Sequence, residues 1–176
     1  MEIVLIRHTA VDVPKGVCYG QTDVTLKSSF EEEADIVRQK LASHTPFDAI
    51  YTSPLSRCVR LATHCGYEDA THDRRLMEIN FGKWEMLAYD DIRDPRLQEW
   101  YDDYLNIAAT DGESFMMQYE RVSSFLDEVK SKPYSKIAIF THGGVLLCAQ
   151  IYAKSLCIED AFNALTPYGG IIKIEI

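Results

Sequence analysis

Short β-rich runs alternate with stretches of helical periodicity along most of the chain. This alternation indicates βαβ units and a mainly parallel sheet covered on both faces. The expected strands are Glu2–Ile6, Asp48–Tyr51, Arg75–Ile79, which carries the weakest signal, and Lys136–Phe140. The alternating tail 170–176 is expected to close the sheet as an edge strand. We therefore expect an α/β fold, a three-layer α/β/α sandwich.

Apolar stripes and capping signals place helices between these strands. The expected helices cover residues 30–41, about 54–64, 115–129 and 145–153. Ser53 suits an N-cap and Pro54 suits the first helical position after it. Thr110 and Glu113 form a capping-box signal before the third helix.

Composition limits the classes of protein that the chain can belong to. Its 176 residues suit a single domain, 1–176. Acidic residues outnumber basic ones 27 to 18, for a net charge of −9, which argues against nucleic-acid or membrane-surface partners. The start of the chain lacks the basic and apolar regions of a signal peptide, and no run is long enough to span a membrane, so a cytoplasmic protein is expected. The five cysteines include no CxxC pair, which suggests reduced thiols rather than a disulfide framework or a zinc site.

Residues 83–110 mix aromatic and acidic side chains and do not fit the strand–helix alternation. Here we expect a helical insertion packed over one end of the sheet. Its aromatic residues are Trp84, Tyr89, Trp100, Tyr101 and Tyr104. Packing onto the core is the favoured role for such a cluster, and stacking on a planar ligand is the alternative.

Three of the expected strands end in polar or charged side chains. Arg7-His8 ends the first, the turn 52–57 with Arg57 follows the second, and Thr141-His142 ends the last parallel one. Sites in open α/β sheets form beyond the carboxyl ends of strands, and helix N-termini attract anions there. Arg57 alone could be a surface residue of a first helical turn. The topology nevertheless predicts that Arg7, His8, Arg57 and His142 meet at one edge.

These segments occur in a fixed order that resembles a known family. The order is LIRH at 5–8, CYGQTD at 18–23, TSPLSR at 52–57, EINFGKWE at 78–85, DGES at 111–114 and THGG at 141–144. Together they resemble the histidine phosphatase superfamily, also called phosphoglycerate mutase-like, and residues 7–26 are most similar to its α-ribazole phosphatase branch. Four positions depart from the usual pattern: Thr9, Ala10, Pro14 and Met86. The departures weaken a mutase assignment and leave the phosphoryl-transfer residues in place.

The resemblance implies a phosphomonoester hydrolase that needs neither metal nor other cofactor. His8 would be the nucleophile that forms a phosphohistidine, with Arg7, Arg57 and His142 as three cationic groups around the phosphoryl oxygens. Glu78 would be the general acid and then the base. Glu85 is its rival, and a packing role for Glu85 is favoured.

On the leaving-group side, Tyr19 and Gln21 would contact the substrate, a small-molecule phosphomonoester. The expected substrate is α-ribazole 5′-phosphate, which belongs to cobalamin biosynthesis. Another small-molecule phosphatase or a phosphoglycerate mutase of the same fold is an alternative. A catalytically inactive module that binds phosphorylated ligands is an alternative from another class.

Overall fold

The computed structural model describes residues 1–176, with the side chain of Phe162 left aside. A five-stranded sheet with the order β3-β2-β4-β1-β5 forms its centre. The strands are β1 (Glu2–Arg7), β2 (Ala49–Thr52), β3 (Thr71–His72), β4 (Lys136–Thr141) and β5 (Ile171–Glu175). The first four strands are parallel to their neighbours, and β5 pairs antiparallel with β1 at the edge. The expected mainly parallel sheet and its C-terminal edge strand are thus confirmed.

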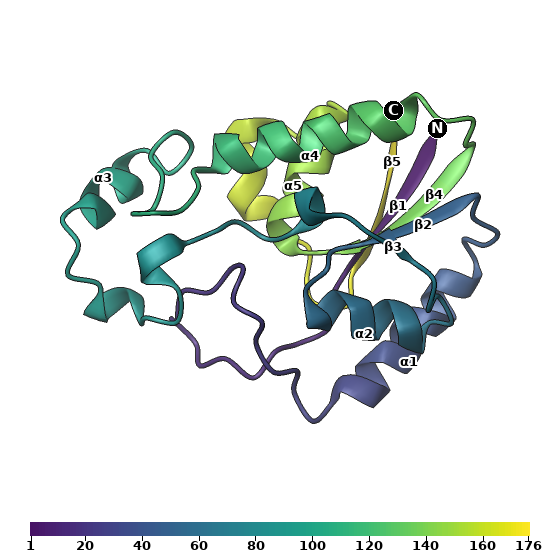
Figure 1. Cartoon of the computed structure of the whole chain (residues 1–176), viewed down its shortest axis with the longest axis horizontal. Coiled ribbons are helices and arrows are strands. Elements are labelled where there is room, and N and C mark those ends of the chain that lie inside the picture. Colours follow the sequence, from purple (N-terminus) through teal and green to yellow (C-terminus); the bar gives the residue numbers. More distant parts are fainter.

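Helices cover both faces of the sheet, which completes the three layers (Figure 1). The helices are α1 (Phe30–Ala42), α2 (Ser56–His64), α4 (Phe115–Lys130) and α5 (Gly143–Tyr152). Alternate residues of β1 and β4 face opposite sides: Ile3, Leu5, Ile137 and Ile139 pack with α4 and α5, while Val4, Ile6, Ala138 and Phe140 pack with α1 and α2. Each fully buried side chain of this kind contributes about 1.5–3 kcal/mol, so the central strands are fixed in register by both layers.

The expected start of the second helix is wrong by two residues. Helix α2 begins at Ser56, because Leu55 keeps an extended backbone. The Ser53 hydroxyl accepts a hydrogen bond from the Leu55 amide at 3.3 Å and lies 2.8 Å from His142 Nε2. Ser53 therefore caps a turn before the helix and supports a histidine at the same time.

The strand expected at Arg75–Ile79 is also wrong. The fourth parallel strand is the short β3, and a 3₁₀ turn over Arg74–Leu76 follows it. The Asp73 carboxylate accepts hydrogen bonds from the Arg75 amide and guanidinium, which closes the turn. The N-cap expected at Thr110 lies instead at Ser114, whose hydroxyl accepts from the Met117 amide at 3.3 Å.

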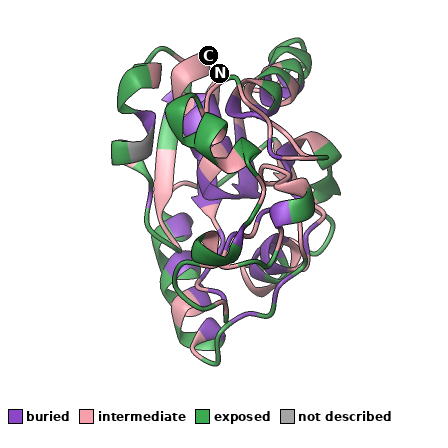
Figure 2. Cartoon of the chain, turned by 90° about the vertical axis from the view of Figure 1, so that its left-hand side faces the viewer, coloured by how far each residue is buried: buried purple, intermediate pink, exposed green. Residues whose placement is uncertain are grey.

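Residues 83–110 are helical only in part. They hold α3 (Arg96–Asp102) and short 3₁₀ turns, joined by irregular chain. This segment lies beyond the carboxyl ends of the strands, at the left of Figure 1. Viewed from that end, buried strands are surrounded by half-buried and exposed segments (Figure 2). A separate small core of Cys18, Trp84, Ile92 and Ala109 stabilises the segment.

Backbone hydrogen bonds join this segment to the loop that follows β1. The Cys18 amide donates to Leu87 O at 2.8 Å, and the Met86 amide donates to Cys18 O at 2.7 Å. The Tyr89 amide donates to Gly16 O at 2.9 Å. The two segments therefore form one wall. No helix among the described residues is long and apolar enough to cross a membrane.

Candidate active site

The carboxyl ends of β1, β2 and β4 bring together the residues that the sequence places there. Parallel pairing continues just past the strands, because the His8 amide donates to Thr141 O at 3.0 Å and the Ser53 amide donates to Phe140 O at 2.9 Å. The rings of His8 and His142 lie 5.2 Å apart, centroid to centroid. The predicted convergence of the two histidines is therefore observed.

His8 is held in one tautomer with one ring nitrogen free. Its Nδ1 lies 2.8 Å from the backbone oxygen of Thr9, which can only accept, so Nδ1 carries the proton. Burial lowers the pKa of His8 to about 3, and the charges of Arg57 and Arg7 act in the same direction. The ring is only 2 % exposed. His8 is thus a neutral imidazole with an unprotonated Nε2, the form that a nucleophile requires.

Arg57 is wholly buried and is fixed by three hydrogen bonds. Its Nη2 donates to Gly20 O at 2.6 Å and its Nη1 to Thr22 O at 3.0 Å. Its Nε donates to His142 Nδ1 at 3.2 Å. Guanidinium has five N–H groups, so these three bonds leave two of those on Arg57 unused.

His142 is a neutral donor and not the third cation that the sequence suggested. Its Nδ1 accepts from Arg57, so the proton lies on Nε2, which donates to Ser53 Oγ at 2.8 Å. Burial holds the pKa of His142 well below its usual range, and the charges of Arg57, Arg121 and Arg7 add to the effect. Two guanidinium groups therefore supply the positive charge of the site.

Arg7 lies against the start of α5. One Nη donates to Thr166 O, and the guanidinium lies over the Tyr168 ring at 4.2 Å. Its Nε is buried and has no hydrogen-bond partner among the described residues, so it is available to a ligand. A Cβ on Gly143 would lie 2.7 Å from Leu165 Cδ1 and 3.2 Å from Arg7 Cζ, so the glycine lets this arginine pack closely against the helix.

Glu78 reaches the same region from the segment after β3. Its Oε1 accepts from Gln118 Nε2 at 2.9 Å and from the Ile79 amide at 3.0 Å. Its Oε2 accepts from the Gly144 amide at 3.1 Å, in the first turn of α5. A Cβ on Gly144 would lie 2.4 Å from Glu78 Oε1, so only glycine leaves room for the carboxyl group.

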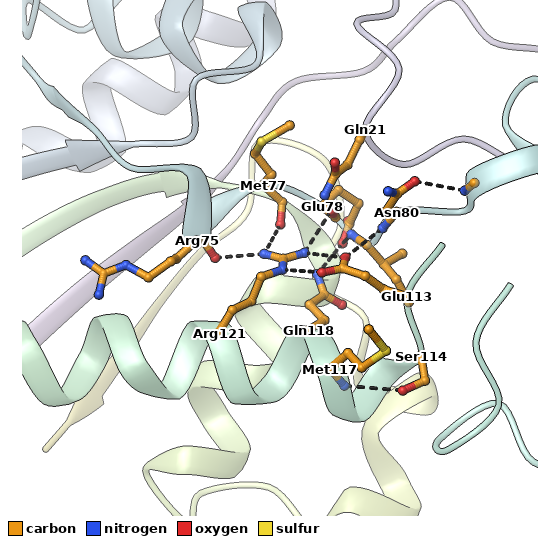
Figure 3. A network of polar contacts seen from close by, with 12 residues as sticks. Gln21, Arg75, Met77, Glu78, Asn80, Glu113, Ser114, Met117, Gln118 and Arg121 are labelled. Atoms are coloured by element: carbon orange, nitrogen blue, oxygen red, sulfur yellow. Dashed lines mark hydrogen bonds and ion pairs between the residues drawn. The ribbon is translucent and has the colours of Figure 1, made fainter. Parts of the chain in front are cut away.

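Arg121 of α4 fixes the chain segment that carries Glu78 (Figure 3). Its guanidinium donates to the carbonyl oxygens of Arg75, Met77 and Glu78 at 2.8, 2.7 and 3.0 Å. It also pairs with Glu113 at 2.8 Å. The carbonyl groups of this irregular segment are thus bound by a side chain in place of a neighbouring strand.

Glu85, the rival acid, holds a loop. Its Oε1 accepts from the amides of Gln21 and Phe81, and its Oε2 accepts from the amides of Gly20 and Thr22 and from the Thr22 hydroxyl. Burial by itself would raise the pKa of Glu85, but these hydrogen bonds lower it below its usual value. The favoured packing role fits this geometry, because the loop supplies the carbonyl groups that bind Arg57.

A pocket of about 400 Å³ opens beside His8, Arg7 and Glu78. Its aromatic wall consists of Tyr19, Phe81, Tyr89, Trp100, Tyr104, Phe115 and Tyr168. Arg7 and Glu78 are the charged groups among its described lining residues. Of the aromatic residues of 83–110, Trp100 packs against Phe81 and also lines the pocket, whereas stacking on a planar ligand stays a prediction.

Tyr19 lines the pocket, whereas the Gln21 side chain is engaged elsewhere. Gln21 Nε2 donates to Glu78 O at 3.1 Å, so the substrate contact expected of Gln21 stays a prediction. Among the described residues, no group of three or more His, Cys, Asp and Glu side chains is arranged to hold a metal ion.

The sequence analysis did not identify two residues of this site. Tyr168 lies over Arg7, its ring is 5.4 Å from that of His8, and its hydroxyl is 2.6 Å from that of Tyr19. The sequence feature that could have identified Tyr168 is its position just before the antiparallel edge strand β5, which begins beside the end of β1. Gln118 is wholly buried. The sequence feature that could have identified it is a glutamine on the otherwise apolar buried face of α4.

Relatives of known name match this chain over most of their length. The chain is 25 % identical to phosphoserine phosphatase 1 of Hydrogenobacter thermophilus, over 79 % of this chain and 69 % of that protein. It is 26 % identical to the adenosylcobalamin/alpha-ribazole phosphatase of Escherichia coli, over 83 % of this chain and 75 % of that protein.

The structure of the alpha-ribazole phosphatase from Shigella flexneri superposes with a TM-score of 0.89, at 25 % identity, over all of this chain and 91 % of that one. Residues 3–176 match the family model of the histidine phosphatase superfamily, branch 1. With its paired histidines and arginines at one sheet edge, the chain belongs to the histidine phosphatase superfamily and is a phosphatase.

Proposed function

We propose that this phosphatase hydrolyses phosphomonoesters through a phosphohistidine on His8, without a metal ion. The observation that carries the proposal is the state of His8: a buried, neutral ring whose free Nε2 lies among Arg7, Arg57 and His142. A nucleophile in this state needs no separate base to remove a proton.

The first step transfers the phosphoryl group to His8. Nε2 forms a bond to phosphorus, the bond from phosphorus to the leaving oxygen breaks, and that oxygen takes the proton of Glu78. The transition state is loose, with charge on three equatorial oxygens, so donors fixed in advance stabilise it. Arg7 Nε and the two remaining N–H groups of Arg57 are such donors.

The second step releases phosphate. A water oxygen bonds to phosphorus and its proton goes to Glu78, while the phosphorus–nitrogen bond breaks and its electron pair returns to Nε2. The enzyme is then back in its starting state, with Glu78 protonated. One carboxyl group thus acts as acid and then as base.

For the substrate, we propose an ester whose alcohol carries a planar, uncharged ring system, such as α-ribazole 5′-phosphate. Two observations support this choice. The pocket beside Glu78 is mostly aromatic, and aromatic side chains stack on planar rings. Proteins named as alpha-ribazole phosphatases are similar to this chain in sequence and in structure.

The same pocket makes phosphoserine and 3-phosphoglycerate weaker candidates. Both carry a carboxylate on the leaving group, which calls for a cation beyond those that bind the phosphoryl group. Arg7 is the one cationic side chain among the described lining residues, and it is assigned to the phosphoryl group. Similarity to a phosphoserine phosphatase nevertheless keeps this substrate in the test.

Two experiments test the proposal. The enzyme is incubated with a ³²P-labelled phosphomonoester, quenched in alkali and analysed for acid-labile phosphohistidine. Label is expected on the native enzyme and absent from His8→Ala. No label on the native enzyme or on Glu78→Gln would leave a binding module.

The second experiment compares kcat/KM for α-ribazole 5′-phosphate, phosphoserine, 3-phosphoglycerate and a sugar phosphate. The ring-bearing ester is expected to be the best substrate. A preference for phosphoserine would refute the substrate assignment, and isomerisation of 3-phosphoglycerate faster than hydrolysis would indicate a mutase. A chelator is expected to leave all rates unchanged.

A further inference from the structure

We propose that Gln118 is a positioning residue that fixes the acid proton of Glu78 on Oε2. The inference rests on the proposed function, in which Glu78 gives its proton to the leaving oxygen. It starts from an asymmetry between the two carboxyl oxygens. Oε1 accepts two hydrogen bonds, from Gln118 Nε2 at 2.9 Å and from the Ile79 amide at 3.0 Å, whereas Oε2 accepts one, from the Gly144 amide at 3.1 Å.

This asymmetry decides where a proton can reside. A protonated carboxyl oxygen is a donor, so a proton on Oε1 would face the two N–H groups that already point at that atom. Oε2 keeps a free lone-pair position beside its single donor. The proton therefore belongs on Oε2, next to Gly144, which lines the pocket with Glu78.

The environment of Gln118 shows that its carboxamide is oriented by Glu78. The residue is wholly buried on α4, and its Oε1 has no hydrogen-bond partner among the described residues. A buried acceptor without a partner is unfavourable, and folding usually removes such groups. Here the amide nitrogen donates to Glu78, the one side chain among those described that is hydrogen-bonded to the Gln118 carboxamide.

One orientation of the amide serves both protonation states of Glu78. With Glu78 ionised, Nε2–H donates to Oε1; with the proton on Oε2, the same bond remains. Gln118 therefore does not have to turn between the two chemical steps. A side chain of the same length without an N–H would leave Oε1 underbonded and allow the carboxyl group to rotate.

The test uses two leaving groups that differ in their need for a proton. The alkoxide of an aliphatic ester needs one, whereas p-nitrophenolate leaves without one. Gln118→Met preserves length and burial but removes the donor. We expect kcat for the aliphatic ester to fall by about 10²-fold, the loss expected for a catalytic group displaced by about 1 Å. We expect the rate of His8 phosphorylation by p-nitrophenyl phosphate, measured in a single turnover so that the Glu78-assisted hydrolysis step does not contribute, to stay close to that of the native enzyme.

Two further variants keep the test interpretable. Gln118→Asn keeps a polar amide that is too short to reach Glu78, and the same selective loss is expected if Gln118→Met folds poorly. Met117→Gln changes an exposed neighbour on the same helix and is expected to leave both rates unchanged. Thermal unfolding of every variant identifies any that is not folded.

Each outcome has a separate meaning. Equal losses on both esters in folded variants would mean that Gln118 only supports the structure, which would overturn the inference. No loss on either ester would overturn it as well. Absence of phosphohistidine on the native enzyme would instead refute the proposed function, and the inference with it.

Discussion

Gly144→Ala places a single methyl group against the proposed acid. The added Cβ would lie 2.4 Å from Glu78 Oε1 and 2.8 Å from Gln118 Oε1. Ordinary contact begins near 3.4 Å, so the Glu78 oxygen must retreat by about 1 Å. A catalytic group displaced by this much costs about 10²-fold in rate.

The stability of the variant is expected to change little. Gly144 lies in the first turn of α5, and alanine is favoured over glycine in a helix by about 1 kcal/mol. Overpacking against two polar side chains costs about 1–3 kcal/mol, which offsets that gain. The variant should therefore fold and show its defect in chemistry.

The assay is the single-turnover rate of His8 phosphorylation by an aliphatic phosphomonoester and by p-nitrophenyl phosphate, which leaves out the later hydrolysis step. We expect the 10²-fold loss on the first ester and a far smaller one on the second. Gly143→Ala is the matched comparison, because its Cβ would meet Leu165 Cδ1 at 2.7 Å and Arg7 Cζ at 3.2 Å, and so crowd the arginine assigned to the phosphoryl group rather than Glu78. It should lower both rates alike. Full activity of folded Gly144→Ala on the aliphatic ester would refute the placement of Glu78 as the acid.

Three further predictions follow from the backbone and the buried ionisable groups. Met86 has a φ of 64°, which is unfavourable for any residue but glycine, and the residue is 44 % exposed. Met86→Gly should therefore raise the free energy of unfolding by about 0.5–1 kcal/mol in urea titration. A free energy of unfolding below that of the native protein would show that the Met86 side chain contributes packing. Glu85→Gln should lower the free energy of unfolding by about 2 kcal/mol at pH 7. Hydrogen bonds lower the pKa of Glu85 in the folded protein, so that stabilisation is present above the unfolded-state pKa of about 4.3 and is lost as the pH falls through the folded-state value. A difference in the free energy of unfolding between native protein and Glu85→Gln that persisted at pH 2 would contradict it. His8 has a pKa of about 3 in the folded protein, so between about pH 6.5 and 3 only the unfolded chain binds a proton on this ring. The free energy of unfolding should therefore decrease as the pH is lowered from about 6.5 to 3, and decrease less in His8→Asn. An imidazole ¹⁵N titration of the native protein with its midpoint near about 6.5 would disprove this.

The sequence was sufficient to place the two histidines and the two arginines at one edge. Apolar runs of β-forming residues predicted β1, β2 and β4, and parallel pairing brings their carboxyl ends together whatever the connecting loops do. His8 and His142 therefore follow from strand positions alone. Their charge states do not, because burial and the single hydrogen bond from Arg57 depend on the assembled site.

Glu78 could be named as the candidate acid from the family resemblance, but the residues that hold it in place could not be predicted. The segment before Glu78 has the composition of a strand, and its conformation is decided by Arg121, 43 residues further along the chain. Hydrogen bonds from a distant guanidinium to backbone carbonyl groups leave no periodic pattern in the sequence. The same is true of Glu85, whose acceptors bind amides more than sixty residues earlier.

The pairing of 86–89 with 16–18 has a consequence for substrate range. The first strip, 86–89, contributes Tyr89 to the pocket wall. The second strip, 16–18, continues into the loop whose Gly20 carbonyl oxygen accepts a hydrogen bond from Arg57. A chimaera that takes only residues 86–89 from a relative would break the hydrogen bonds to 16–18 and disturb the loop that binds the Arg57 guanidinium. Swaps of specificity between family members should therefore transplant both strips as a unit.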